Sequence, residues 1–238
     1  MVISKEVKKI VNKKPPGEVI TYDDFSTLGN LNSVVLTLSK LYKSGVLEKL
    51  GKGLFYKPKK TRFGKLKPSE NEILKALLKK NKQGFIAGTS AQNKLGLTTQ
   101  ISNELVISGK LEKHERVIGG LTVKYKKSNI SYGKKNVEQL QIIDALKNIK
   151  KIPDTDVNSS LILIKNKLEE YSKKQIKEMF NLAKNSQPRV RAIVGAMMEL
   201  LNYSEFSDEL YESLNPLSTY KLNITHDALP NKGKWKIK

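Results

Sequence analysis

The stretch that decides the fold is residues 20–57, ITYDDFSTLGNLNSVVLTLSKLYKSGVLEKLGKGLFYK. An apolar helical stripe leads into Lys43-Ser44-Gly45, and two short alternating segments follow, joined by Gly51-Lys52-Gly53. Glycine at both ends of that connection permits the positive φ of a tight turn. A helix followed by a basic hairpin is the order of a winged helix-turn-helix, in which the helix enters the DNA major groove and the hairpin lies along the phosphates.

The predicted helix has two chemically different sides at 3.6 residues per turn. We expect the apolar side to face the core, and it consists of Leu31, Val34, Val35, Leu38, Leu41 and Tyr42. The other side offers amide and hydroxyl groups for base edges and ammonium groups for phosphates. On it, Leu36 is either an ordinary exposed leucine or a contact for a thymine methyl group. This outer side consists of Asn32, Ser33, Leu36, Ser39, Lys40 and Lys43.

The flanking residues complete the motif. Thr21 is expected to cap a preceding helix whose first turn holds two acids, and Gly29-Asn30 supplies the turn before residue 31. Residues 46–50 and 54–57 alternate as half-buried strands do. A protein-interaction module of the same shape is the alternative, because geometry rather than invariant chemistry defines the motif. The candidate DNA-contacting residues are Thr21, Tyr22, Asn30, Asn32, Ser33, Leu36, Lys40, Lys43, Lys49, Lys52 and Lys57.

The charge of the chain points to a polyanionic partner. Its 238 residues carry 44 Lys and Arg against 23 Asp and Glu, a net charge of +21. The excess is +7 over residues 1–60, +11 over 61–137 and only +3 over 138–238. Double-stranded DNA is therefore the first candidate partner. Part of the charge can instead be solvated surface, and the scarcity of arginine weakens the case for many bidentate guanine contacts.

Cysteine is absent, so a disulfide framework, a thiolate metal site and a thiol nucleophile are excluded. We find neither an apolar run of the ~20 residues that cross a bilayer nor the apolar stretch of a signal peptide. No membrane association is predicted, and the cytoplasm is the expected compartment.

Beyond the predicted wing, the pattern is that of an α+β protein. Residues 58–68 lie between two prolines without periodicity, which predicts a linker. Ser69 and Glu72 form a capping box for a helix that ends near residues 80–82. Strands are expected at 84–88, 104–108 and 121–125, with a helix from residue 89 or 90 to Gly96 and a turn at Gly119-Gly120. We therefore expect a winged-helix domain at 1–60 and a second domain at 61–238, with a mixed α/β part at 61–136 and a mainly helical part at 137–238.

The predicted C-terminal helices span residues 137–149, 156–171, 173–185, 188–202 and 208–214. The helix at 188–202 is the most apolar, and its Met197 and Met198 are expected to fill the core rather than form an adaptable binding surface. Short strands are possible at 220–224 and 234–237, the second of which contains the only tryptophan, Trp235.

Three blocks of sequence resemble the AbiEi-like antitoxins of abortive-infection toxin–antitoxin systems. The first comprises residues 38–47 and 51–56, the second is Ala91-Gln92-Asn93-Lys94-Leu95-Gly96-Leu97-Thr98-Thr99-Gln100, and the third is Pro188-Arg189-Val190-Arg191-Ala192 with Gly195-Ala196. The similarity covers most of the chain and is weakest after Ser204.

The resemblance implies an antitoxin, active in phage defence, that represses its own operon by binding promoter DNA. It also implies a functional partner, a neighbouring toxin of nucleotidyltransferase type, with or without direct contact. The expected contact region is Leu95, Gly96, Leu97, Thr98, Thr99 and Gln100. The ordinary alternative is that Gly96 ends a helix and the next residues satisfy a turn. A stand-alone regulator, or a nucleic-acid-processing accessory factor, remains the other functional hypothesis.

Catalysis has little support in the sequence. The two histidines, His114 and His226, are far apart and are expected at the surface. Asp154 and Asp156 could mimic a divalent-metal pair, but they occupy a predicted helix start, where acids are favoured. Gly51-Lys52-Gly53 precedes a strand, whereas a phosphate-binding loop precedes a helix. We therefore predict no enzyme activity, no metal site and no cofactor.

Overall fold

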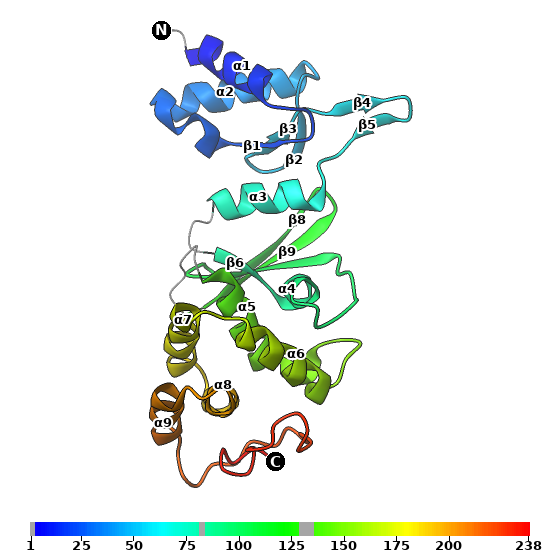
Figure 1. Ribbon diagram of the computed structural model, residues 1–238. Coiled ribbons are helices and arrows are strands. Elements are labelled where there is room, and N and C mark those ends of the chain that lie inside the picture. The colour runs from blue at the N-terminus through cyan, green and yellow to red at the C-terminus, as the bar shows by residue number, and fades with distance from the viewer. Residues whose placement is uncertain (1–2, 81–83, 129–135) are drawn as a thin grey trace. The chain divides into compact units, whose positions relative to one another are not determined.

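The computed structural model describes all residues except 1–2, 81–83 and 129–135 (Figure 1). The chain forms two compact units, one of residues 1–82 with 115–123 and the other of residues 83–114 with 124–238. Helices and sheets are mixed, and residues 137–212 are mainly helical, so the predicted α+β class is confirmed. The first unit extends past residue 60, where the sequence suggested a boundary.

A winged-helix arrangement opens the first unit. Its sheet has the order β1-β3-β2, with β3 antiparallel to both neighbours. Val7 and Val11 of the first helix pack with Phe25, Leu38 and other buried side chains in one hydrophobic core. The elements are α1 (Ile3–Lys13), β1 (Val19–Thr21), the 3₁₀ helix η1 (Tyr22–Leu28), α2 (Leu31–Lys43), β2 (Glu48–Gly51) and β3 (Leu54–Tyr56).

The segment predicted as a linker, residues 58–68, is instead a β-hairpin followed by a helix. Strands β4 (Lys59–Thr61) and β5 (Gly64–Leu66) pair antiparallel, and α3 (Glu70–Lys80) begins after the second proline. The linker prediction was wrong because no residue of either strand is buried, so the sequence lacks the alternation that marks a half-buried strand. Ser69 caps α3 as predicted, since the Glu72 N–H donates to Ser69 Oγ at 3.3 Å, whereas the Glu72 carboxylate pairs with Lys75 instead of completing the predicted box.

The second unit combines a sheet with five α-helices that follow it in sequence. Strand order in the sheet is β6-β7-β9-β8, and its residues 115–118 in β8 and 121–123 in β9 belong to the first unit. Helix α8 is deeply packed, and Met197 and Met198 are both 0% exposed, which confirms the core prediction. The elements are β6 (Gly84–Ala87), α4 (Gly88–Lys94), β7 (Glu104–Gly109), β8 (His114–Ile118), β9 (Leu121–Lys127), α5 (Val137–Lys147), the 3₁₀ turn η2 (Ile149–Lys151), α6 (Val157–Glu169), α7 (Lys173–Lys184), α8 (Pro188–Leu200) and α9 (Ser204–Glu212).

The two strands expected at 220–224 and 234–237 are absent, and this end of the chain holds a single parallel bridge between Tyr220 and Ile237. Asn223 and Lys236 have φ values of 55° and 58°, which interrupt an extended backbone in each segment. Trp235 is nevertheless 0% exposed, because this segment packs into the core of the second unit.

Candidate nucleic-acid interface

Helix α2 is fixed at both ends by local signals. Asn30 caps the start, since its Oδ1 accepts the Ser33 N–H at 3.1 Å. At the other end Ser44 is the C-cap, and Gly45 follows with φ 73°, a conformation that glycine adopts without penalty. These signals agree with the helix bounds that the sequence predicts.

The buried side of α2 is narrower than predicted. Val34 and Leu38 are buried, but Leu31 is 56% exposed and Tyr42 is 43% exposed, so placing them in the core was wrong. Both lie in terminal turns of the helix, beyond the reach of the small core. Thr37 is buried instead. Its hydroxyl is satisfied there, because Oγ1 donates to the Ser33 carbonyl at 2.8 Å.

The outer side of α2 is accessible, as predicted. Asn32, Lys40 and Lys43 are exposed and Leu36 is 62% exposed, whereas Ser33 is half-buried. Asn30 is exposed too, although its side-chain oxygen is engaged in capping.

Thr21 does not belong to this surface. It is 2% exposed, and both its N–H and its Oγ1 approach Asp24 Oδ2, at 2.8 and 3.3 Å. This carboxylate and the threonine form the capping box at the start of η1, which confirms the N-cap prediction. We therefore withdraw Thr21 as a DNA-contacting candidate.

The predicted wing is a very short turn. Lys49 and Lys52 are exposed, and Lys57 is half-buried with its ammonium 3.4 Å from the Asn12 carbonyl. Gly53 has φ 74°, and a Cβ there would lie 3.0 Å from Cε2 of Tyr22, so the aromatic ring closes over the turn. Tyr22 thus acts as a half-buried support for the wing.

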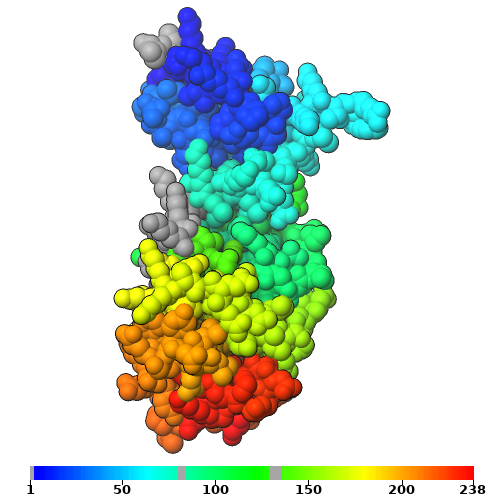
Figure 2. Space-filling view, in the orientation of Figure 1, coloured from blue at the N-terminus to red at the C-terminus, as the bar shows by residue number. Residues whose placement is uncertain are grey.

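The hairpin β4–β5 adds a basic surface that the sequence interpretation missed. Lys59, Lys60, Arg62, Lys65 and Lys67 are all exposed. The available signal was the composition of residues 58–68, with five basic and no acidic residues around a Thr-Arg-Phe-Gly turn. Figure 2 shows this hairpin protruding from the surface of the first unit.

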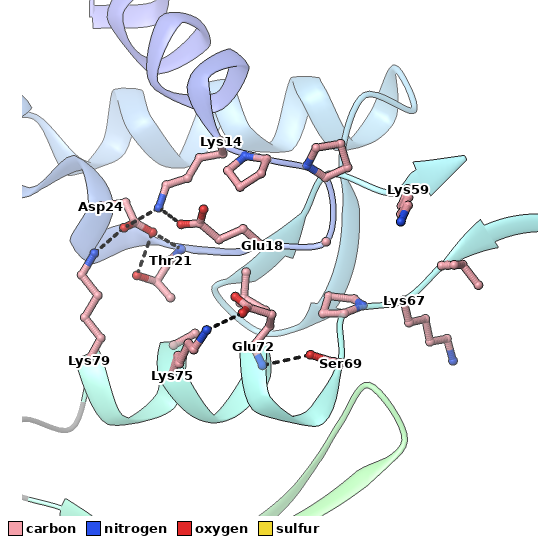
Figure 3. A pocket seen from close by; sticks show the side chains of 17 residues that line it. Lys14, Glu18, Thr21, Asp24, Lys59, Lys67, Ser69, Glu72, Lys75 and Lys79 are labelled. Atoms are coloured by element: carbon pink, nitrogen blue, oxygen red, sulfur yellow. Dashed lines mark hydrogen bonds and ion pairs between the residues drawn. The ribbon is translucent and has the colours of Figure 1, made fainter. Parts of the chain in front are cut away.

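A polar cleft of about 570 Å³ lies between the segment after α1 and helix α3, all within the first unit (Figure 3). Asp24 is one of the residues that line it, and its carboxylate is 2.6 Å from Lys79 Nζ and 3.3 Å from Lys14 Nζ. Burial alone would raise the pKa of Asp24, but hydrogen bonds from Lys79 and the Thr21 N–H and the charge of Lys14 outweigh it and hold the pKa below its usual value.

Several charges inside this cleft pair with one another. Lys14 also pairs with Glu18, and Lys75 Nζ lies 2.7 Å from Glu72 Oε1. The pair of Lys79 with Asp24 links α3 to the winged helix, whereas Lys59 and Lys67, which also line the cleft, are exposed. The cleft therefore supports the position of α3 against the winged helix rather than offering a catalytic arrangement.

The expected partner region of the second unit is only partly accessible. Leu95, Leu97 and Thr98 are buried, whereas Gly96, Thr99 and Gln100 are exposed. Gly96 has φ 77°, and the N–H groups of Gly96 and Leu97 donate to the carbonyls of Asn93 and Gln92, both at 2.9 Å. This pattern ends α4 in a Schellman motif, so the turn interpretation of Gly96 is confirmed.

Of the remaining polar candidates, His114 and Asp156 have structural roles. His114 is exposed and stacks on Tyr125 at a centroid distance of 4.1 Å, and His226 is exposed. Asp156 caps α6, accepting the N–H groups of Asn158 and Ser159 at 2.7 and 3.1 Å. Over residues 3–80, 84–128 and 136–238, no three His, Cys, Asp or Glu residues gather in a cluster that could hold a metal ion. The helices in these ranges are also too short or too polar to cross a bilayer.

Comparison with known proteins identifies the fold and the family. The structure is similar to the crystal structure of the RV2827C protein from Mycobacterium tuberculosis, with a TM-score of 0.52 and 11% identity over 98% of this chain and 89% of that chain. At this identity the likeness concerns the fold alone. A search of curated proteins finds no match. The sequence profile of the family of unknown function DUF6088 matches residues 6–179, nearly three quarters of the chain, and the protein therefore belongs to that family.

Proposed function

We propose that this protein binds double-stranded DNA through α2 and represses its own promoter, and that it serves as the antitoxin of a toxin–antitoxin system. The observation that carries the DNA-binding part is the two-sided character of α2. Val34 and Leu38 anchor the helix in the core, while Asn32, Leu36 and Lys40 remain exposed on the outside. A helix held in this way can enter the major groove without rearrangement of the fold.

Chemical roles follow from the position of each group on the helix. In helix-turn-helix proteins, residues near the N-terminus of the recognition helix contact base edges. Asn32 occupies that part of α2, and an asparagine amide can pair with the N6 and N7 edge of adenine. Lys40 and Lys43 lie in the last turns, where ammonium groups suit phosphates. Lys52 at the wing turn would add a further phosphate contact.

The antitoxin part of the proposal rests on the resemblance of the sequence to AbiEi-like antitoxins. In the second unit, a nucleotidyltransferase-type toxin could reach Gly96, Thr99 and Gln100, because these residues are exposed beside the buried Leu95 and Leu97. Leu95, Leu97 and Thr98 would support that surface from beneath.

The first test measures binding to the duplex upstream of the protein's own gene and to a scrambled duplex by fluorescence anisotropy. A repressor should prefer its own site by about 10³-fold or more. Asn32→Ala with Ser33→Ala should remove the preference, whereas Lys52→Ala and Lys57→Ala should weaken both duplexes equally and reduce the salt dependence. Asn181→Ala, an exposed asparagine of the second unit, is the matched control and should bind as the wild type does.

Equal affinity for every duplex would contradict the repressor proposal. It would favour the alternative of an accessory factor that binds nucleic acid without sequence preference. The observation behind this alternative is that 40 of the 44 basic residues are lysines, which contact phosphates as point charges rather than as bidentate readers of guanine.

The antitoxin role is tested in cells with the full chain. Co-expression with the product of the adjoining gene should restore growth, and the variant with Asn32→Ala and Ser33→Ala should restore it equally, because its second unit is unchanged. Failure of the wild-type chain to restore growth would contradict the antitoxin role without bearing on DNA binding.

A further inference from the structure

The hairpin β4–β5 is an arm that is anchored at its base and has no hydrophobic core of its own. Pro58 and Pro68 at its two ends are buried, while every residue of its two strands is exposed or half-exposed. The strands pair in the register Lys59 with Leu66 and Thr61 with Gly64. At about 3.3 Å per residue, the arm extends roughly 10 Å beyond its base. Figures 1 and 2 show it standing out from the first unit.

The tip of this arm is ordered by local bonds. The Phe63 N–H donates to Thr61 Oγ1 at 3.2 Å, and Thr61 Oγ1 donates to the Gly64 carbonyl at 3.0 Å. Gly64 has φ 111°, so the turn depends on glycine. The arm is also tied to the winged helix, because Lys65 Nζ lies 2.6 Å from Glu48 Oε1 of β2. A tip fixed in this way loses little conformational freedom on binding.

The side chains at the tip are unusual for a surface turn. Phe63 is 84% exposed, and the guanidinium carbon of Arg62 lies 4.7 Å from the centre of its ring. Single exposed apolar residues are common, but this one sits at the end of an arm with five basic and no acidic residues. An aromatic side chain on a cationic arm matches the chemistry of proteins that bind the minor groove, which place Arg or Lys in the groove and insert an apolar wedge between base steps.

We propose that the β4–β5 hairpin is a second DNA-binding element, whose Arg62 and Phe63 enter the minor groove next to the major-groove site of α2 and kink the duplex. This inference rests on the proposed DNA binding and adds to it a second contact and a deformation. Lys59, Lys60 and Lys67 follow the phosphates on either side, where each neutralised charge releases counterions. Phe63 partly unstacks one base step, and the guanidinium of Arg62 is attracted by the negative potential of the narrow groove.

The experiment uses the full chain and a duplex from its own upstream region with a donor and an acceptor fluorophore at its two ends. Wild-type binding should bring the ends closer, as expected for a kink of about 20–90°. Phe63→Ala should abolish most of this change and weaken binding about tenfold, with the same preference for the upstream over the scrambled duplex. Arg62→Ala should lower the slope of log affinity against log salt by about one.

A second readout separates the two grooves. Distamycin, a minor-groove ligand, should compete with the wild type but should have little effect on a variant that combines Arg62→Ala and Phe63→Ala. The variant with Asn32→Ala and Ser33→Ala should lose its preference among duplexes and keep the kink. Leu217→Ala removes a side chain that is 92% exposed in the second unit, and this matched control should leave affinity and kink unchanged.

The outcomes distinguish this inference from the proposed function. If the wild type prefers its upstream duplex and Phe63→Ala binds and bends it equally well, the hairpin proposal is overturned and the repressor proposal stands. If the wild type binds no duplex, both are overturned. If Phe63→Ala leaves DNA binding intact and instead prevents the chain from restoring growth beside its neighbouring gene product, the tip contacts a protein, which also overturns the proposal.

Discussion

Helices α2 and α8 have the same length, 13 residues, and opposite surroundings. In α8, every residue from Ala192 to Met198 is buried. In α2, only Val34, Thr37 and Leu38 are buried, and Leu36 is 62% exposed. Apolar content alone therefore does not tell a core helix from a surface helix. What differs is the arrangement, because α8 is apolar around its whole circumference from Ala192 to Met198, whereas α2 is buried only on a narrow side.

The two helices also depend on different kinds of residue, a closely packed glycine in α8 and a capping asparagine at the start of α2. Gly195 in α8 lies against the buried ring of Trp235, where a Cβ would be only 2.2 Å from Cη2 and Cζ3. No glycine occurs in α2, whose special residue is the capping Asn30. Helix α8 therefore depends on tertiary packing, whereas α2 depends on its local N-terminal cap and keeps its outer side exposed.

The largest expected effect tests the narrow core side of α2 with two leucines two positions apart. Leu38→Ala should lower the free energy of unfolding by about 3 kcal/mol, because Leu38 is 0% exposed and its removal leaves a cavity. Leu36→Ala should change it by less than about 0.5 kcal/mol. Urea denaturation followed by circular dichroism measures both. Equal losses would mean that the outer side of α2 is packed, which contradicts its assignment as a DNA-contacting surface.

A smaller effect is expected from the packing of α8. Gly195→Ala should lower the free energy of unfolding by about 2 kcal/mol, because the new methyl group overpacks the contact with Trp235. The fluorescence of Trp235, the only tryptophan, should change with it. Gly233→Ala is the matched control, since its Cβ would meet no atom within 4 Å. A tolerated Gly195→Ala would show that the ring can move aside, and α8 would then be less tightly specified than α2.

Much of this architecture follows from short-range signals in the sequence. The end of α2 at Lys43-Ser44-Gly45, the Ser69 cap of α3 and the termination of α4 at Gly96 are all local, so a single sequence predicts them. The five C-terminal helices also lie near their predicted positions, because prolines and apolar periodicity bound them.

The errors arise where the deciding contact is distant or absent. The hairpin at 59–66 buries no side chain, so it leaves no hydrophobic period in the sequence. Leu31 and Tyr42 fall on the correct side of α2, but the extent of the core, set by α1 and the sheet, decides that they are exposed. The segment around Trp235 resembles a strand in composition, yet its contact with α8 fixes a different backbone.

The candidate site follows the same division. Exposure of Asn32, Lys40 and Lys52 is predictable from helical and turn geometry. The burial of Thr21 is not predictable, because its hydrogen bonds to Asp24 become evident only when the two groups are placed together. The basic composition around Arg62 and Phe63 is evident from the sequence, but the hairpin that presents these residues is not.

The smallest expected effect compares one carboxylate from each unit. The carboxylate of Asp24 pairs with Lys14 and Lys79 and accepts a hydrogen bond from the Thr21 N–H. The carboxylate of Glu199 in α8 pairs with Lys234 and accepts hydrogen bonds from Asn231 Nδ2 at 2.7 Å and Trp235 Nε1 at 2.8 Å. Burial would raise both pKa values, but in each case the hydrogen bonds and the positive charge prevail and hold the pKa below its usual value.

A carboxylate whose pKa is lower in the folded than in the unfolded chain stabilises the fold above its unfolded pKa and loses this effect as the pH falls through the folded value. Asp24→Asn should therefore cost about 1 kcal/mol at pH 7, and the difference from the wild type should shrink between about pH 5 and pH 2. Denaturation curves at several pH values measure it, with Glu199→Gln as the counterpart in the second unit. A cost of Asp24→Asn that stays constant down to pH 2 would mean that Lys14 and Lys79 do not act on its charge, and the cleft would then hold α3 by shape alone.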